Sequence, residues 1–203
     1  MDDVSIREPK QKRSIEKKAK IIEAGAELFR EKGYHNTNTI EIAKAAGVST
    51  GTVYGYFKDK RDIYLAAYEY LHDTHFQPLL DELVNIPKPI DIKVFVEKWV
   101  DGHINFCVAS KYAATDWVLM QDTDPEIMRF FAAYEDRFHS SLVSALDSPN
   151  ISKKNLEERT YLLYSLTDSL GLEYAFRTRS NVSLEILREE TVKLLIHLLT
   201  KVE

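Results

Sequence analysis

The stretch GVSTGTVYGYFKDK, residues 47–60, is a poor helix by composition but is bounded by helix signals. Glycine inside a helix costs about 1 kcal/mol relative to alanine, and this stretch has Gly51 and Gly55. Ser49 is of the residue type that caps helices, so we expect a short helix over about residues 50–56. Three apolar residues have the spacing to hold it against a core: Val48, Val53 and Phe57. A helix this short must be specified by its neighbours, because so few residues cannot offset the cost of helix nucleation.

A second short helix is predicted just before this stretch, and the two together form a helix-turn-helix. Asn38 followed by Glu41 has the spacing of a capping box, and Gly47 ends the helix that begins there. An earlier amphipathic helix is predicted from Ser14, a candidate N-cap, to Gly33. Its apolar stripe recurs at steps of three and four: Ile15, Ala19, Ile22, Ala26 and Phe29.

The composition is that of a soluble globular protein, with 44% hydrophobic and 29% charged residues in 203. No apolar run approaches the roughly 18 residues that a membrane span needs, and the N-terminal residues lack the apolar segment of a signal peptide. One cysteine, Cys107, excludes an internal disulfide and fits a reducing compartment. We therefore expect a cytoplasmic protein with no membrane partner.

Charge is spread unevenly along the chain, although the net charge is −5. Residues 1–62 hold 13 Lys and Arg against 10 Asp and Glu, whereas residues 63–203 hold 14 against 22. A basic N-terminal third on an acidic remainder indicates that one end of the chain meets a polyanion. The alternative is a solvated, charged start of a helix.

The rest of the chain has helical periodicity, and strand-like alternation is absent. The segment IPKPID, residues 86–91, is a linker. Helices are predicted at 60–85 with a break near Pro78, 92–110, 112–121, 125–147, 153–178 and 183–202. We therefore predict an all-α chain of about nine helices. It divides into a flexible basic arm at 1–12, a three-helix helix-turn-helix domain at 13–60, and a helical body at 61–203.

From about Ile15 to Leu65, the sequence resembles the DNA-binding domain of the TetR family of transcriptional regulators. The most specific part of the match is GVSxGTVYxYFKxK, and the remainder of the chain matches only in its layout. The resemblance implies a sequence-specific transcriptional regulator rather than an enzyme. It implies a ligand-responsive repressor that binds a palindromic operator in double-stranded DNA as a homodimer. Residues 61–203 would then bind a small-molecule effector and form the dimer, with no cofactor.

The resemblance also assigns DNA contacts to particular residues. Four stand where the family touches bases or nearby backbone: Thr50, Gly51, Thr52 and Tyr54. Three stand where it touches phosphates: Thr39, Tyr56 and Lys60. The arm and the first helix add phosphate or minor-groove contacts from Lys12, Arg13 and Lys17. Ile40 departs from the family, which often carries a polar residue there, and Gly55 replaces a large side chain.

Two stripes of leucine within residues 156–199 suit a four-helix dimer interface. They comprise Leu162, Leu163, Leu166, Leu170, Leu184, Leu187, Leu195 and Leu198. Dimerisation would let two short helices, about 34–36 Å apart, reach successive major grooves. The alternative is that these leucines only fill the core of one protomer.

Aromatic and amphipathic residues gather in the middle of the chain and suit an apolar pocket with a few polar anchors. The candidates are His72, His75, Phe76, Trp99, His103, Phe106, Trp117, Met120, Phe130, Phe131, Tyr134 and Phe138. For any one of them, filling the core is the alternative. Three carboxylates are placed to face such a pocket: Asp101, Asp116 and Asp168. Any of them would suit a cationic or hydroxylated ligand.

Two other functions compete with a DNA-binding regulator. A helical di-metal carboxylate protein would use the pairs Glu69 with His72 and Asp136 with His139, which lie three residues apart on one helix face. This spacing is common by chance, so we expect no metal site. The other alternative is a helix-turn-helix adaptor that does not bind DNA.

Overall fold

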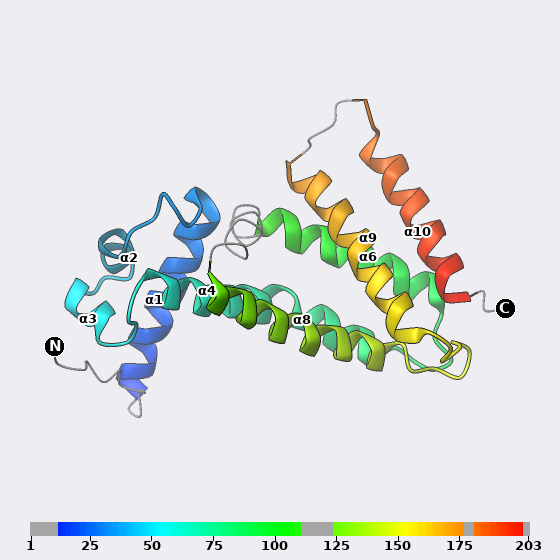
Figure 1. The fold of residues 1–203 in the computed structure, drawn as a ribbon, viewed down its shortest axis with the longest axis horizontal. Helices are drawn as coiled ribbons and strands as arrows, with labels where there is room; N and C mark the ends of the chain where they lie inside the picture. Colours follow the sequence, from blue (N-terminus) through cyan, green and yellow to red (C-terminus); the bar gives the residue numbers. More distant parts are fainter. Residues whose placement is uncertain (1–11, 111–123, 177–180, 201–203) are drawn as a thin grey trace. The chain divides into compact units, whose positions relative to one another are not determined.

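The computed structural model describes residues 12–110, 124–176 and 181–200. Within these ranges the chain forms nine α-helices and no strand, which confirms the all-α prediction (Figure 1). The helix predicted at 112–121 lies outside the described residues. Among the described helices, none combines the length and the apolar character that crossing a membrane requires.

The chain divides into two compact units. The first comprises Met1–Asp73 with Tyr112–Ile127, and the second comprises Thr74–Lys111 with Met128–Glu203. The helices of the first unit are α1 (Lys12–Lys32), α2 (Thr39–Ala45), α3 (Thr50–Tyr54) and most of α4 (Lys60–His75). Those of the second are α5 (Gln77–Val84), α6 (Ile92–Ala109), most of α8 (Pro125–Ala145), α9 (Leu156–Phe176) and α10 (Leu184–Thr200).

The buried face of α1 begins later than its sequence pattern predicts. Ala26 and Phe29 are buried as expected, but Ile15 is 53% exposed. None of the residues from Lys12 to Lys20 is buried, so the first turns of α1 extend beyond the core and leave their apolar side chains in water. The predicted N-cap is also wrong, because α1 already includes Ser14.

The caps predicted for the two short helices are confirmed. The side chain of Asn38 accepts hydrogen bonds from the backbone N–H groups of Ile40 and Glu41, at 3.1 and 2.9 Å. Ser49 Oγ accepts one from the N–H of Thr52 at 3.2 Å. Between the two helices, Gly47 has φ of +67°, a left-handed conformation that glycine adopts without steric cost. These local bonds specify α2 and α3 despite the weak helix propensity of α3.

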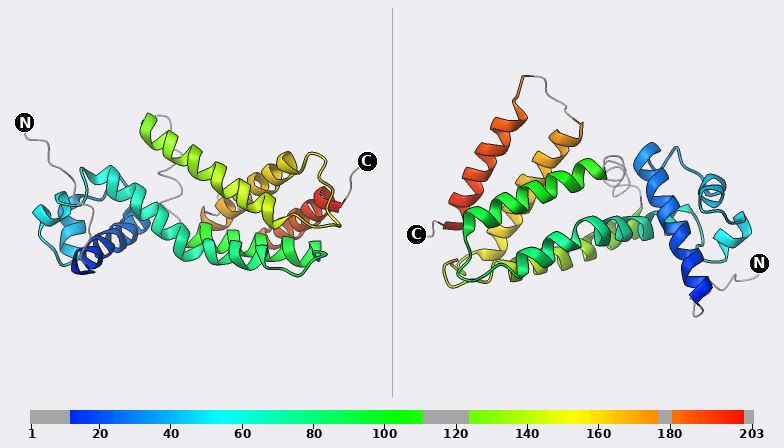
Figure 2. Two further views of the ribbon diagram at one scale, coloured as in Figure 1. Left: turned by 90° about the horizontal axis from the view of Figure 1, so that it is seen from below. Right: turned by 180° about the vertical axis from the view of Figure 1, so that it is seen from behind.

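The second unit is organised around the buried indole of Trp99. This side chain lies on α6, and its Nε1 donates a hydrogen bond to Thr167 Oγ1 of α9 at 3.0 Å. Helix α6 packs on both α9 and α10, and the three helices lie side by side (Figure 2). The predicted break between α4 and α5 is confirmed, with Phe76 as the residue between them and Pro78 in the first turn of α5.

Candidate functional site

Helix α3 presents the predicted base-contacting residues from a face that is open to solvent. Val53 is fully buried and, with buried Phe57 behind it, anchors the helix. The other four residues of the helix are exposed or partly exposed: Thr50, Gly51, Thr52 and Tyr54. A Cβ at position 51 would meet only Ser49 Oγ, at 3.9 Å. The fold therefore has no steric need for glycine at position 51.

Hydroxyl groups on this surface are held by hydrogen bonds between helices. Thr39 Oγ1 and Tyr54 OH lie 3.1 Å apart, which joins the first residue of α2 to the last of α3. Tyr56 OH lies 2.7 Å from Ser14 Oγ on α1. These bonds restrict the tyrosine side chains before any partner binds, so less conformational entropy is lost on binding.

The ammonium group of Lys60 has partners inside the domain. Nζ donates to the carbonyl oxygens of Tyr34 and Thr37, at 2.7 and 2.9 Å, and lies 4.0 Å from the centroid of the Tyr34 ring. The first residue of α4 is thereby tied to the loop between α1 and α2. The phosphate contact expected of Lys60 stays a prediction, and the structure adds a structural role that the sequence did not indicate.

The basic residues at the start of α1 are accessible. Arg13 is exposed and Lys17 is partly exposed, and neither forms an ion pair within the described ranges. The predicted arm at 1–12 lies outside the described residues except for Lys12. In the first turn of α2, the side chain of Ile40 is also accessible, with an exposed fraction of 67%. An apolar side chain so placed can contact a thymine methyl group but cannot make the hydrogen bonds of the polar residue that the family often has there.

An ion-pair cluster joins the start of α4 to the start of α8 within the first unit. Arg61 contacts Asp124 and Glu126, each at 2.9 Å, and Asp59 at 3.8 Å. Asp124 also accepts the backbone N–H of Glu126 at 2.9 Å, so it caps α8. The hydrogen bond from Arg61 lowers the pKa of Asp124 below its usual value. This cluster was not predicted from the sequence, because Arg61 and Asp124 are 63 residues apart.

Part of the predicted pocket set is assembled as an aromatic cluster in the second unit. The ring centroids of Phe76 and Trp99 lie 5.6 Å apart, and those of Phe76 and Phe138 lie 5.0 Å apart. His103, Phe106 and Tyr164 complete the cluster. Trp99 and Phe76 are buried and touch one another, so the core-filling alternative holds for these two rings.

The other pocket candidates are distributed differently. Phe131 and Tyr134 are buried on α8 beside Phe130, whose ring stacks on Tyr134. His72 is buried, whereas His75 is exposed and does not join the aromatic cluster. Three candidates, Trp117, Met120 and Asp116, lie outside the described residues. Asp101 is exposed and pairs with Arg188 at 2.6 Å, so it faces solvent rather than a pocket.

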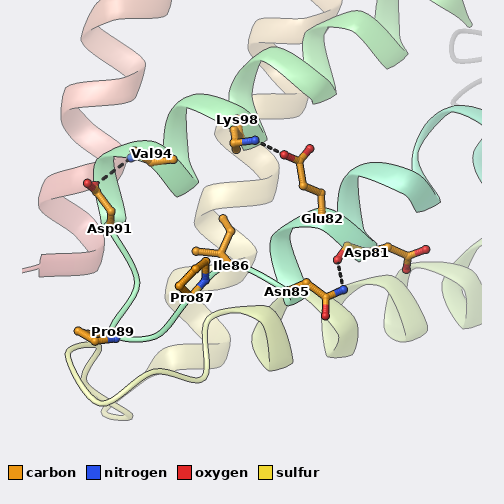
Figure 3. Close-up of a pocket in the computed structure, with 9 residues that line it drawn as sticks. All are labelled: Asp81, Glu82, Asn85, Ile86, Pro87, Pro89, Asp91, Val94 and Lys98. Carbon is orange, nitrogen blue, oxygen red and sulfur yellow. Dashed lines mark hydrogen bonds and ion pairs between the residues drawn. The ribbon is translucent and has the colours of Figure 1, made fainter.

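An open groove of about 690 Å³ lies where α5 meets the start of α6 (Figure 3). Its lining includes three carboxylates and one lysine: Asp81, Glu82, Asp91 and Lys98. Lys98 pairs with Glu82, and Asp91 is engaged as the N-cap of α6. None of the predicted pocket residues lines this groove.

The described residues contain one group of side chains with metal-ligand chemistry, His103, Cys107 and Asp168. Burial, and secondarily the charge of Asp168, raises the pKa of the Cys107 thiol to about 12, so the sulfur is unreactive as it stands. The residue pairs of the di-metal alternative do not belong to this group, and Glu69 of the first pair is exposed. His139 Nε2 donates to the Glu157 carbonyl oxygen at 2.9 Å.

The leucines predicted at a dimer interface divide into two groups. Leu162 and Leu166 on α9 are 47% and 37% exposed, as an interface needs. Leu170 and Leu195 are 3% and 0% exposed within one protomer, so the prediction is wrong for them. Leu187 and Leu198 are half-buried against the core. Apolar residues that the leucine pattern missed lie exposed on the same two helices: Tyr161, Ile186 and Leu194.

Comparison with known proteins agrees with the helix-turn-helix geometry. Residues 21–67 match the sequence profile described as bacterial regulatory proteins, tetR family. The HTH-type transcriptional regulator HbdR of Aromatoleum sp. (strain CIB) is 37% identical over 76 residues, which cover 37% of this chain and 33% of that regulator. The HTH-type transcriptional regulator CymR of Pseudomonas putida is 23% identical over 89% of this chain and 94% of its own. The similarity to HbdR, which has the higher identity of the two, thus spans about a third of that regulator.

Solved structures share the fold over nearly the whole chain. A protein from Mesorhizobium loti, described as a TetR-family transcriptional regulator, matches with a TM-score of 0.75 and 20% identity over 94% of this chain and 100% of its own. A transcriptional regulator from Saccharomonospora viridis in complex with choline has a TM-score of 0.72 and 18% identity, and the match covers 93% of this chain and 100% of its own. FadR from Bacillus subtilis in complex with stearoyl-CoA has a TM-score of 0.66 and 18% identity, and the match covers 88% of this chain and 97% of its own. Residues 21–67 therefore form a TetR-family DNA-binding domain, and the chain has the fold of a TetR-family transcriptional regulator.

Proposed function

We propose that this protein is a repressor that binds a palindromic DNA operator as a homodimer and releases it when a small molecule binds the helical body. The observation that carries the proposal is the surface of α3. Val53 holds the helix from behind, while a glycine that the fold does not require lies at the centre of the exposed face. Threonine and tyrosine hydroxyls surround that glycine, and they can reach both phosphates and base edges.

The dimer follows from the reach of so short a helix. α3 has five residues and contacts only a few base pairs, so specificity requires a second copy one helical turn along the DNA. Exposed apolar residues on α9 and α10 offer the surface for that second copy, with Leu162 and Leu194 among them. Monomers seldom leave such groups uncovered.

The proposed effector is a small molecule that binds the helical body. The fold relatives from Saccharomonospora viridis and Bacillus subtilis were solved with choline and stearoyl-CoA, and this supports a small-molecule ligand for the present chain. Helix α4 starts at Lys60 in the DNA-binding unit, and its last residues belong to the second unit. A ligand that favours one position of α4 would shift the population of DNA-competent dimers. We propose a cytoplasmic location, where a regulator of bacterial DNA would act.

Operator selection from random double-stranded DNA with the purified protein tests the central claim. We expect enrichment of a palindrome whose half-sites are centred about one helical turn apart. Thr50→Val, which removes a hydroxyl from α3, should weaken binding or change the enriched bases, and the control Thr200→Val at the end of α10 should not. Equal affinity for every sequence would contradict the proposal, and the absence of binding to any sequence would favour the adaptor that does not bind DNA.

A further inference from the structure

Three side chains with metal-ligand chemistry meet between α6 and α9 in the second unit. His103 and Cys107 are one helical turn apart on α6, so both project toward the same face, where Asp168 of α9 joins them. One ligand atom from each, an imidazole nitrogen, the sulfur and a carboxylate oxygen, lies within 4.8 Å of the other two. Imidazole and cysteine side chains are buried, and the Asp168 carboxylate is 41% exposed.

A glycine on α9 allows this close approach. A Cβ at Gly171 would lie 2.5 Å from Cys107 Sγ and 3.5 Å from His103 Cδ2. The sulfur and this edge of the imidazole therefore face the backbone of α9, one turn from Asp168. Because Cδ2 adjoins Nε2 in the ring, Nε2 is on the side of the sulfur and the carboxylate.

The buried imidazole is poorly satisfied by the protein itself. His103 is 3% exposed, yet its Nδ1 has no hydrogen-bond partner. Its Nε2 lies 3.3 Å from Asp168 Oδ1, which is longer than the usual 2.7–3.2 Å of an N–H···O hydrogen bond. Within the described ranges no lysine or arginine pairs with Asp168. Nε2 of His103 and the carboxylate of Asp168 therefore share one long contact. A cation between them would bind both groups.

We propose that His103, Cys107 and Asp168 bind one transition-metal dication of the Zn²⁺ or Co²⁺ type. Sulfur and nitrogen donors select such ions over Mg²⁺ and Ca²⁺, which take oxygen ligands. Ligand distances for zinc are about 2.3 Å to sulfur and about 2.0–2.2 Å to nitrogen and oxygen, so the half-exposed Asp168 side chain closes on the ion by a small movement. On binding, the Cys107 thiol loses its proton to solvent and becomes a thiolate. Three protein ligands leave a fourth position for water.

This site replaces the expectation that the chain binds no metal, and it does not depend on the proposed DNA binding. Sequence spacing could not reveal the site, because its three residues lie on two different helices. The ligand pair His103 and Cys107 has an ordinary four-residue spacing, and the third ligand is more than 60 residues away. The site is therefore a product of helix packing.

Titration of the full-length, metal-free protein with Co²⁺ tests the proposal by absorption spectroscopy. We expect saturation at about one ion per chain, a thiolate-to-cobalt charge-transfer band, and the intense visible bands of a four-coordinate ion, all removed by excess Zn²⁺. Saturable binding without a thiolate band would overturn the proposal, because it would place the ion at other histidines or carboxylates. Absence of saturable binding would overturn it equally.

Matched variants locate the ion. Cys107→Ser should abolish the charge-transfer band, and Asp168→Asn should lower the affinity for Co²⁺ by roughly tenfold or more. Asp136→Asn is the control, since this exposed carboxylate on α8 lies outside the ligand group. Far-ultraviolet circular dichroism shows whether each variant is folded. If Cys107→Ser unfolds, Asp168→Asn still tests the site, because it changes a half-exposed side chain. Wild-type affinity in Asp168→Asn would contradict the assignment.

Discussion

Thr39 Oγ1 and Tyr54 OH lie 3.1 Å apart, so the first residue of α2 and the last residue of α3 share a hydrogen bond on the exposed face of the DNA-binding domain. Both hydroxyls were assigned to DNA from sequence. Their contact shows that the two helices present them as one unit. A hydroxyl held in this way can still accept or donate a second bond to a phosphate or a base.

Tyr54→Phe should weaken operator binding by about 0.5–1.5 kcal/mol, or roughly two- to tenfold, because it removes both the bond to Thr39 and the contact with DNA. Fluorescence anisotropy with the selected operator measures the change. The control is Tyr70→Phe, which removes the hydroxyl of a partly exposed tyrosine on α4. Unchanged affinity for the Tyr54 variant would remove this tyrosine from the interface.

Gly51→Ala should separate stability from function. The added Cβ has open space, and alanine favours the helix, so the free energy of unfolding should rise by about 0.5–1 kcal/mol. Operator affinity should fall, because the methyl group holds the helix away from DNA. Urea unfolding and anisotropy on the same preparation give both quantities. Gly55→Ala is the matched variant, with its Cβ 3.3 Å from the Thr52 carbonyl oxygen. Gain of affinity at position 51 would show that DNA does not approach the helix there.

Lys60→Ala should lower stability as well as DNA affinity. Its ammonium bonds the carbonyl oxygens of Tyr34 and Thr37, and loss of a hydrogen bond to a charged group costs about 1.5–3 kcal/mol. If Lys60 also meets a phosphate, the slope of log affinity against log salt should fall by about one. Lys58→Ala, an exposed neighbour, is the control for stability. A normal salt slope with reduced stability would assign Lys60 a structural role alone.

The ion pair between Arg61 and Asp124 should make stability depend on pH at the acid end. The pKa of Asp124 is lowered in the folded protein, chiefly by the hydrogen bond from Arg61. The pair therefore stabilises the fold above the usual carboxylate pKa, and this contribution disappears as the pH falls through the lowered value. At pH 7, the Asp124→Asn variant should have a lower melting temperature than the wild type. The difference in melting temperature should shrink near pH 3, and thermal unfolding at both pH values measures it. A difference independent of pH would contradict a contribution from the ion pair, because asparagine still caps α8 and loses only the charge. Glu126→Gln is the comparison that removes the other carboxylate bound to Arg61.

Leu166→Glu should convert the dimer to monomers, because it places a charge in the exposed apolar face of α9. Analytical ultracentrifugation measures the change, and operator affinity should fall with it. The control is Val94→Glu, at another exposed apolar position, on α6. A dimer that persists in the Leu166 variant would move the interface away from this face.

Local features of the fold were predictable because they depend on residues within a few positions of one another. Asn38 and Ser49 cap α2 and α3 as expected, since a cap needs only the next three residues. The break between α4 and α5 was predictable for the same reason, because proline cannot donate a backbone hydrogen bond inside a helix. The motif around Val53 likewise predicted a short helix anchored by a buried valine, and the structure has this helix, whereas its contact with DNA stays a prediction.

Features that depend on contacts between distant helices were beyond the sequence. Helix α9 carries leucine on two faces, so periodicity alone could not show that Leu162 is exposed and Leu163 is buried. Lys60 has the charge expected of a phosphate ligand, but the carbonyl groups that hold it come from a loop whose path depends on packing.

The same division applies to the proposed sites. The short helix predicted over 50–56 is observed as α3, Thr50–Tyr54, and is specified by capping and anchoring residues that are near it in the chain. The meeting of His103 and Asp168 required α6 and α9 to pack in one register, with Gly171 permitting their approach. Hydrogen bonding along the chain is local and can be predicted from neighbouring residues, whereas the register between helices depends on how all of their side chains pack together.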